Sequence, residues 1–316
     1  MVEKMDSTLK FVQPGIMAPI PPVGRYVIFS VSPEAGRAAL TEALVRLAAL
    51  ADGNRLVIGV GPRLVEALGA TVPDLAEMPD LSEHGVHVPS TPTALWCWLR
   101  GSDRGEMVLA TRKLERALTP ALHLDRVVEA FRHGEPTAAH GRDLSGYEDG
   151  TENPQGDAAI AAALVSGQGP GLDESSYVAV QQWVHDLDAF EDMTAEVRDH
   201  VMGRRITDNE EIDDAPISAH VKRTAQESFD PEAFVLRRSM PWALSNKFGL
   251  FFVAFGHSHA AFEAQMRRMA GYEDGETDAL FGFSKPVSGA YLWCPPVLNG
   301  QLDLRQLGIA AAIPPA

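Results

Sequence analysis

The first half of the chain alternates predicted strands and helices in a fixed order, and this order limits the fold more than any other feature. Strands and helices are predicted in the order strand, helix, strand, strand, helix, strand. The segments are residues 26–31, 33–48, 55–60, 94–100, 113–118 and 122–131. Within the fourth segment Trp96 and Trp98 alternate with Cys97, so the two tryptophans should share one face of the strand.

The second half repeats this order. Strands are predicted at residues 177–184, 234–238, 249–255 and 289–293, and helices at 187–201 and 259–269. One such unit is typical of a ferredoxin-like domain. The sequence therefore predicts an α+β fold of two ferredoxin-like domains, with antiparallel sheets and peripheral helices, over residues 1–140 and 141–316.

Three further local signals complete the expected organisation. Residues 11–23 are rich in proline and predict an extended arm rather than a helix. Ser32 followed by Pro33 predicts a helix start, with Ser32 as the N-cap. Residues 141–176 and 203–231 are long, polar and loop-rich, and loops of such length usually serve a site or are disordered.

The charge balance excludes some partners. The chain has 27 Lys and Arg against 43 Asp and Glu, a formal net charge of −16. Such a surface repels phosphate backbones and anionic lipid, so we expect neither nucleic acid nor a membrane surface as a partner. Acidity is also a common means of staying soluble, and that simpler interpretation stands beside the first.

Cysteine usage and the absence of targeting signals favour the cytoplasm. Cys97 and Cys294 are too few for a disulfide framework and form no C-x-x-C motif. The N-terminus lacks the basic region and apolar run of a signal peptide. The apolar run at residues 249–256 is the length of a strand and far too short to span a membrane.

Residues 146–154, Gly-Tyr-Glu-Asp-Gly-Thr-Glu-Asn-Pro, form the most unusual run. Its glycines, adjacent acids and Asn-Pro ending predict a tight loop that presents a carboxylate on a closely approached backbone. A calcium loop is not supported, because no Glu closes the pattern at the required spacing. A near-copy at residues 271–277 lacks the Asn-Pro ending, and we interpret it as a coincidental turn.

Two other positions leave alternatives open. His220 follows the acidic run at residues 210–214, and from the residues alone it is either a structural histidine or a ligand. Arg237 and Arg238 end an apolar strand, so one of them should point inward. The inward arginine either pairs with an acid or faces an anionic or polarisable ligand.

Taken together, these segments resemble the dye-decolourising peroxidases, a family of haem enzymes, and among them the short, cytoplasmic bacterial members. The resemblance runs from the arm at residues 13–16 to Pro296. Residues 146–150 match the family's G-x-x-D-G motif, with Tyr147 where Phe is usual. Residues 249–253 match the strand that forms the floor of the distal pocket.

The resemblance implies roles for individual residues. His220 would be the axial iron ligand of one haem b per chain, and Asp278 the carboxylate behind it. Asp149, Arg237 and Ser239 would be the catalytic residues, although many relatives carry Asn in place of Ser239. The haem would contact a set of residues from five segments: Glu148, Gly150, Thr151, His220, Arg223, Arg237, Leu250, Phe252 and Asp278.

These roles make chemical sense together. Asp149 would accept a proton from hydrogen peroxide and return it to the departing oxygen, while the permanent charge of Arg237 stabilises the developing charge. Arg237 should also hold Asp149 ionised, because a nearby cation lowers the pKa of a carboxyl group.

The resemblance thus implies a peroxidase that oxidises bulky aromatic, dye-like or porphyrin-type donors. The alternative is a haem-binding or haem-delivery protein with incidental peroxidase activity. A chlorite-dismutase-like enzyme is disfavoured by the G-x-x-D-G loop. We also expect a homo-oligomer, a dimer or larger, and a preference for neutral or cationic donors over anionic dyes. The triplet at residues 307–309, Leu-Gly-Ile, admits an encapsulating shell protein as a partner, although a packed tail is the simpler interpretation.

Overall fold

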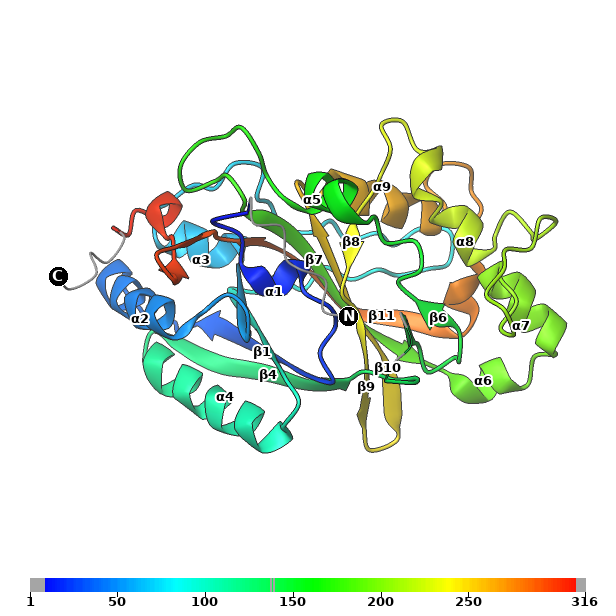
Figure 1. Cartoon of the computed structure of the whole chain (residues 1–316), viewed down its shortest axis with the longest axis horizontal. Helices are drawn as coiled ribbons and strands as arrows, with labels where there is room; N and C mark the ends of the chain where they lie inside the picture. Colours follow the sequence, from blue (N-terminus) through cyan, green and yellow to red (C-terminus); the bar gives the residue numbers. More distant parts are fainter. Residues whose placement is uncertain (1–8, 137, 139, 311–316) are drawn as a thin grey trace.

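The first half of the chain forms an antiparallel sheet with helices on one face. A computed structural model describes residues 9–310 except 137 and 139. The sheet consists of β1 (Val23–Val31), β2 (Leu56–Val60), β3 (Leu95–Gly101) and β4 (Leu122–Phe131). Its order is β2-β3-β1-β4, with all neighbours antiparallel. Helices α2 (Arg37–Leu50) and α4 (Arg104–Leu118) bury leucines against this sheet (Figure 1).

The second half repeats the arrangement. Its strands are β7 (Ser176–His185), β8 (Leu236–Arg237), β9 (Met240–Leu244), β10 (Lys247–Gly256) and β11 (Ser284–Cys294). β7 lies between β11 and β10, and β8 and β9 both pair with the other edge of β10. This is the strand order of the first half, and α9 (Ala260–Met269) packs on the sheet as its helix. The prediction of two ferredoxin-like units is therefore confirmed.

The two sheets meet at both edges and enclose an aromatic core. β11 joins β2 through Trp293 and Val60, and β4 joins β9 through Ala130 and Trp242. Between the sheets, Tyr26 stacks on Phe251 with ring centroids 3.9 Å apart. Trp96 and Trp98 belong to this core, whereas Cys97 faces the helices of the first half. The alternation predicted for this strand is thus confirmed.

Several local predictions were wrong. The proline-rich arm contains a short helix, α1 (Pro14–Met17), because proline is well tolerated in the first turn of a helix. Helix α2 begins at Arg37 rather than after Ser32, with Gly36 at its N-cap. The single helix expected at residues 187–201 is two, α6 (Leu187–Glu191) and α7 (Ala195–Met202). The second begins anew because the Thr194 hydroxyl accepts a hydrogen bond from the Val197 amide.

Short elements lie between and after the strands of the two sheets. They are α3 (Pro62–Ala67), the ribbon of β5 (Gly141–Arg142) and β6 (Glu148–Asp149), α5 (Gly156–Ala163), α8 (His220–Arg223) and the hairpin of β12 (Val297–Leu298) and β13 (Gln301–Leu302). Single turns of 3₁₀ helix occupy Gln226–Ser228, Ala279–Gly282 and Arg305–Leu307. Among the described residues, no helix is both long and apolar enough to cross a membrane.

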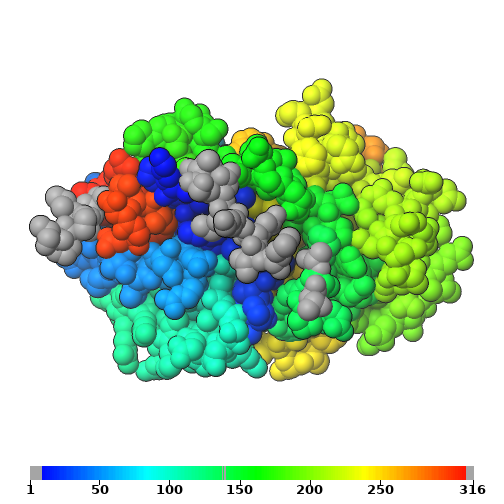
Figure 2. All heavy atoms as spheres, in the orientation of Figure 1, coloured from blue at the N-terminus to red at the C-terminus, as the bar shows by residue number. Residues whose placement is uncertain are grey.

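The segment after β11 returns to the first half of the chain. Leu302, Leu304, Leu307 and Ile309 are all buried in the core that α2 forms with the first sheet. In the space-filling view this red segment lies against the blue surface of the first half (Figure 2). Leu307 and Ile309 of the Leu-Gly-Ile triplet are therefore part of a hydrophobic core, whereas Gly308 between them is exposed.

Candidate active site

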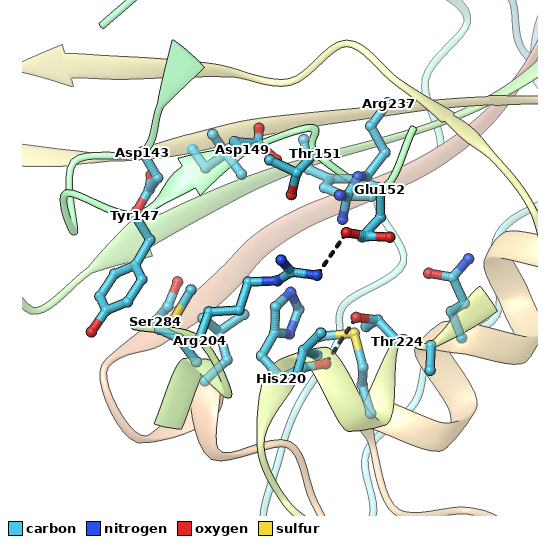
Figure 3. A pocket seen from close by; sticks show the side chains of 18 of the residues that line it. Asp143, Tyr147, Asp149, Thr151, Glu152, Arg204, His220, Thr224, Arg237 and Ser284 are labelled. Atoms are coloured by element: carbon cyan, nitrogen blue, oxygen red, sulfur yellow. Dashed lines mark hydrogen bonds and ion pairs between the residues drawn. The ribbon is translucent and has the colours of Figure 1, made fainter. Parts of the chain in front are cut away.

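A cavity of about 340 Å³ lies in the second half, between the sheet face covered by α9 and the loops around α8. Its size is within the range of roughly 300–1,000 Å³ that is usual for small-molecule sites. One part of its wall is apolar, with Leu250 and Phe252 from β10 and Phe262, Met266 and Met269 from α9. The remainder carries charged and polar side chains, and these cluster on two facing walls (Figure 3).

The first polar wall is formed by His220, at the start of α8. Its Nδ1 lies 2.7 Å from Oδ2 of Asp278, a side chain that is fully buried. The other carboxylate oxygen of Asp278 accepts a hydrogen bond from the Leu280 amide at 2.8 Å, which fixes the carboxylate at the start of a 3₁₀ turn. The imidazole is thereby oriented through one nitrogen, and its ring projects into the cavity (Figure 3).

The facing wall carries Asp149 and Arg237, and one residue holds them in register. Asp149 ends β6, and Gly150 after it has φ 88°, a conformation that favours glycine. The Asn153 side chain accepts a hydrogen bond from the Arg237 amide at 2.7 Å and donates one to the Arg237 carbonyl at 3.1 Å. The Asn-Pro ending of the loop thus ties the aspartate to the strand that carries the arginine.

The pKa of Asp149 is raised, which differs from the sequence-based expectation. Burial is the largest cause, and the charge of Asp143 adds to it. The charge of Arg237 opposes these effects, as expected, but does not outweigh them. A carboxyl group in this state titrates closer to neutral pH than an exposed aspartate, which suits a group that both accepts and returns a proton.

Tyr147 differs from the usual family residue by a hydroxyl, and this hydroxyl has a partner. It donates a hydrogen bond to the carboxylate of Asp199 on α7. Asp199 also accepts a hydrogen bond from the Ile206 amide at 3.1 Å. The substitution therefore links the loop of Asp149 to α7.

Arg204 also lines the cavity, and no sequence motif indicated it. Its guanidinium lies 2.6 Å from Glu152 and 2.5 Å from Glu211, and in Figure 3 it extends between His220 and Glu152. The partners come from separate loops, 52 and 7 residues away along the chain. Only the folded arrangement of these loops identifies the group.

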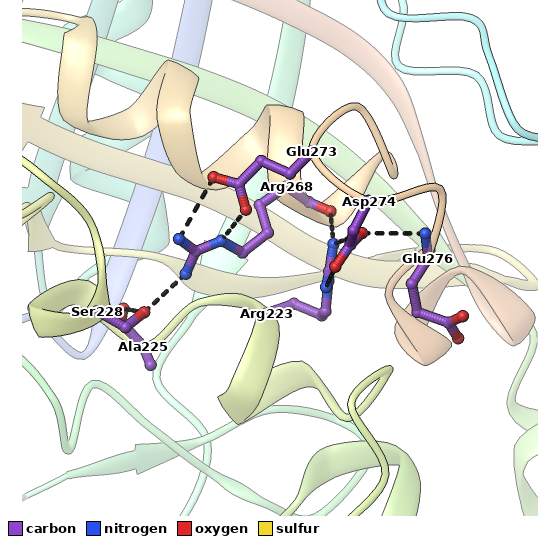
Figure 4. Close-up of polar contacts among 7 residues, drawn as sticks. All are labelled: Arg223, Ala225, Ser228, Arg268, Glu273, Asp274 and Glu276. Carbon is purple, nitrogen blue, oxygen red and sulfur yellow. Dashed lines mark hydrogen bonds and ion pairs between the residues drawn. The ribbon is translucent and has the colours of Figure 1, made fainter.

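Arg223 lies outside the cavity lining and instead fixes α8 from behind. Its buried guanidinium donates to both carboxylate oxygens of Asp274, at 2.8 and 2.9 Å, and to the Arg268 carbonyl at 2.6 Å (Figure 4). The neighbouring Glu273 pairs with Arg268 at 2.5 Å. The near-copy at residues 271–277 is thus more than a coincidental turn, because it supplies the carboxylates that hold these two arginines.

Replacing Asp274 with Asn should destabilise the protein by about 2 kcal/mol, because a buried guanidinium loses its charged acceptor. The hydrogen bonds from Arg223 lower the pKa of Asp274 to about 2. The stabilisation should therefore be complete above the ordinary aspartate pKa of roughly 4 and disappear as the pH falls toward 2. Urea unfolding of wild type and variant at pH 7 and pH 3 measures both effects.

Asp208→Asn is the matched control, since Asp208 pairs with Arg205 at 3.0 Å on the surface. That change should leave the unfolding free energy almost unchanged, because an exposed ion pair is screened by solvent. Equal losses in the two variants would contradict the role of Asp274.

The other expected site residues lie at different distances from the cavity. Glu148, Thr151, Leu250 and Phe252 line it, as do Asp149, His220 and Arg237. Gly150 instead lines a second cavity of about 790 Å³, whose wall Asp149 and Thr151 share with the first.

Ser239 and Arg238 lie outside the lining of the first cavity. The Ser239 hydroxyl is buried and accepts a hydrogen bond from the Val253 amide at 3.2 Å. Arg238 turns toward the N-terminal arm and donates to the carbonyls of Ile16 and Met17. Arg237 is therefore the inward-facing member of the arginine pair.

The donor set of the cavity fits haem. Among residues 9–310, apart from the two undescribed positions, no group of three or more His, Cys, Asp or Glu side chains could hold a metal ion. A metal at His220 would thus have fewer than three such protein ligands, which fits an iron whose other ligands come from a porphyrin. A histidine backed by a carboxylate, in a cavity with one apolar wall, suits a haem iron.

Comparison with known proteins identifies the family. The profile of the Dyp-type peroxidase C-terminal region matches residues 140–299, about half of the chain. A dye-decolorizing peroxidase of Mycolicibacterium paratuberculosis is 29% identical over 95% of this chain and 88% of its own length.

Solved structures agree with this match. A variant of DypB from Rhodococcus jostii RHA1, solved in complex with haem, is 26% identical and superposes with a TM-score of 0.77 over 88% of this chain and 94% of its own. The encapsulated DyP-type peroxidase from Mycobacterium smegmatis shares the fold, with a TM-score of 0.80 over 91% of this chain, 96% of its own and 24% identity. On these grounds the chain belongs to the Dyp-type peroxidases, a family of haem-dependent enzymes.

Proposed function

We propose that the chain binds one haem b through His220 and uses hydrogen peroxide to oxidise bulky aromatic, dye-like or porphyrin-type donors. One observation carries the proposal. His220, backed by Asp278, lies on one wall of a single cavity. Asp149 and Arg237 lie on the facing wall (Figure 3). Haem, when bound, would supply the two electrons that reduce hydrogen peroxide, and the donors would replace them one at a time.

The residues that would hold haem follow from the cavity lining. His220 is the iron ligand in this proposal, and Asp278 increases its basicity by accepting a hydrogen bond from its other ring nitrogen. Leu250 and Phe252 provide an apolar surface for the porphyrin. Arg237 and Lys222 line the same cavity and are the cations available to two propionates. Arg204 lines it too, but its guanidinium is already paired with Glu152 and Glu211. This local charge matters in a chain whose net charge is −16.

Asp149 and Arg237 divide the work on peroxide. Asp149 accepts a proton from hydrogen peroxide and returns it to the departing oxygen, a role that typically accelerates a reaction by about 10²–10⁴-fold. Arg237 cannot lose its proton and stabilises the negative charge that develops as the O–O bond breaks. The raised pKa of Asp149 supports a group that exchanges its proton readily.

Ser239 and Arg223 act at one remove in this proposal. The Ser239 hydroxyl accepts a hydrogen bond from the Val253 amide and so fixes β10 beside the segment that carries Arg237. Arg223, through its ion pair with Asp274, fixes the short helix that carries His220. Neither lines the cavity of Asp149 and His220. Both are therefore positioning residues rather than groups in contact with haem.

The alternative, a haem-delivery protein, needs an axial ligand but no distal acid or cation. The presence of Asp149 and Arg237 on one wall, held in register by Asn153, therefore favours the enzyme.

A cytoplasmic, homo-oligomeric state is part of the same proposal and rests on the isolated cysteines and the family resemblance. A shell partner bound through residues 307–309 would require Leu307 and Ile309 to leave the core. Residues 311–316 lie outside the described part of the chain.

The proposal predicts a ferric Soret band in the haem-loaded protein and peroxide-dependent turnover of phenolic donors. Because the surface is acidic, a cationic dye should be oxidised faster than an anionic dye of similar potential, and added salt should reduce the difference. Stopped-flow spectra with one equivalent of peroxide measure the reaction with peroxide. Steady-state rates with each dye at low and high salt measure the preference for cationic donors. Slow reaction with peroxide together with rapid haem transfer to apomyoglobin would favour the carrier instead.

A further inference from the structure

A buried histidine–aspartate pair lies in the wall of the same cavity, and the proposed reaction does not use it. His185 ends β7, and its Nε2 lies 3.1 Å from Oδ1 of Asp143. Its Nδ1 lies 2.7 Å from the hydroxyl of Ser284 on β11. The side chain of His185 is 5% exposed and that of Asp143 15%. His185, Asp143 and Ser284 all line the cavity that contains Asp149.

Both ring nitrogens of His185 have a hydrogen-bond partner. Nε2–H donates to the Asp143 carboxylate, and Nδ1 shares a hydrogen bond with the Ser284 hydroxyl. Because β7 and β11 pair directly at His185 and Ser284, the sheet itself fixes the ring. Asp143 is therefore attached to a rigid element.

Asp143 in turn organises the loop that leads to Asp149. Its Oδ2 accepts a hydrogen bond from the Ser145 amide at 2.9 Å. Its backbone amide donates to the Tyr147 carbonyl, and its carbonyl accepts from the Gly146 amide, each at 2.9 Å. This is the aspartate turn geometry that fixes short loops. The loop connects β5 to β6, and the pairing of these two strands places Asp149 opposite Gly141.

Asp143 also places a negative charge near Asp149. Burial opposes the ionisation of Asp143, but hydrogen bonds and charge from His185, with help from Ser145, lower its pKa to about 2. Asp143 is thus charged throughout the ordinary pH range, and that charge raises the pKa of Asp149.

The other charged groups around Asp149 come from separate elements. Arg237 on β8 and His220 on α8 lower the pKa of Asp149, against the effect of its burial. In the adjoining ribbon Arg142 pairs with Glu148 at 3.1 Å, and Arg204 in the cavity is held by Glu152 and Glu211. Among these groups, Asp143 is the acid whose charge raises the pKa of Asp149.

We propose that His185 and Asp143 form a positioning pair for Asp149, in which His185 anchors and ionises Asp143, and Asp143 fixes the loop and the charge beside Asp149. The inference rests on the proposed function and extends it. In this proposal His185 and Asp143, which do not contact peroxide, determine the pH range in which Asp149 works. Its direct consequence is a property of the Asp149 carboxyl, and this can be measured without turnover.

The test is a ¹³C NMR titration of the Asp149 carboxyl in the full-length chain without added haem, assigned by comparison with Asp149→Asn. Asp143→Asn keeps the size of the side chain and removes its charge. It should shift the Asp149 titration to lower pH by about one unit, since a neighbouring like charge is removed. An unchanged midpoint, or a shift to higher pH, would overturn the proposal.

A double-mutant cycle separates this role from mere packing. His185→Leu should raise the pKa of Asp143 by more than about one unit, because the buried carboxyl loses its hydrogen-bond donor. In the Asp143→Asn background, the same His185 change should move the Asp149 midpoint by less than about 0.2 units, because His185 acts only through Asp143. If His185→Leu moved the Asp149 midpoint equally in the wild-type and the Asp143→Asn backgrounds, the coupling through Asp143 would be contradicted.

The chain offers a matched control in a second histidine–aspartate pair. His87 Nε2 lies 3.2 Å from Asp80 Oδ2, but these side chains are 64% and 49% exposed and lie outside the cavity lining. His87→Leu and Asp80→Asn should leave the Asp149 titration unchanged.

The haem-loaded enzyme gives a second, independent readout. For Asp143→Asn, the acid limb of the rate of reaction with peroxide should move to lower pH by the same amount as the NMR midpoint. If the protein failed as a peroxidase, the NMR shift would still test the pair. If the NMR midpoint stayed fixed while turnover was normal, the pair alone would be disproved.

Discussion

Replacing His220 with alanine is expected to abolish haem retention while leaving the fold intact. His220 supplies the single imidazole on its wall of the cavity, and its ring lies at the surface of a preformed pocket rather than in the packed core. Loss of the residue that hydrogen-bonds a metal ligand typically lowers metal affinity by about 10–100-fold, and loss of the ligand itself should lower it further. The ratio of Soret to protein absorbance after reconstitution and gel filtration measures the effect.

Two further variants make this result specific. Asp278→Asn keeps an oxygen that can accept from the Leu280 amide, and should lower haem affinity by about 10–100-fold without abolishing binding. His200→Ala removes a histidine of α7 whose Nδ1 contacts the Glu196 carbonyl, and it should leave haem content unchanged. Full haem retention in His220→Ala, with an unaltered spectrum, would disprove the axial assignment.

Replacing Arg237 with leucine is expected to leave haem bound but to slow the reaction with peroxide by about 10²–10³-fold, the usual effect of removing one preorganised charge or donor. A second effect has a definite sign. Arg237 is the largest influence that lowers the pKa of Asp149, so its removal should raise that pKa further. The acid limb of the pH profile should then move to higher pH, because more base is needed to ionise Asp149.

Stopped-flow measurement of the peroxide step from pH 4 to 9 separates the two effects. Arg104→Leu is the control, since Arg104 pairs with Glu129 on the surface of the first half. That variant should match wild type in rate and pH profile. A normal rate at every pH in Arg237→Leu would remove Arg237 from the reaction.

The sequence carried enough information for the repeated units and for the residues of the motifs. The strand periodicity placed the ends of β7 and β10 within two residues and found the C-terminal part of β11. The Trp96–Cys97–Trp98 alternation placed the tryptophans and the cysteine on opposite faces of their strand, and the structure confirms this. These signals are local, because strand periodicity and turn residues depend on neighbours along the chain.

The features that the sequence did not reveal depend on contacts between distant segments. His185 meets Asp143 from 42 residues away, and Arg223 meets Asp274 from 51 residues away. Each partner is an ordinary residue in its own segment, so no local pattern distinguishes it. The pKa of Asp149 was wrong in direction for a related reason, since burial outweighs the nearby cation and burial is set by the whole fold.

The return of the C-terminal segment to the first half has a consequence for biosynthesis. The core beneath α2 needs Leu302, Leu304, Leu307 and Ile309, and the arm residue Gln13 donates to the Pro295 carbonyl. A ribosome synthesises this half first, yet its hydrophobic core is complete only when nearly the whole chain has emerged. The N-terminal unit should therefore depend longest on chaperones, since its apolar surface stays uncovered throughout synthesis of the second half.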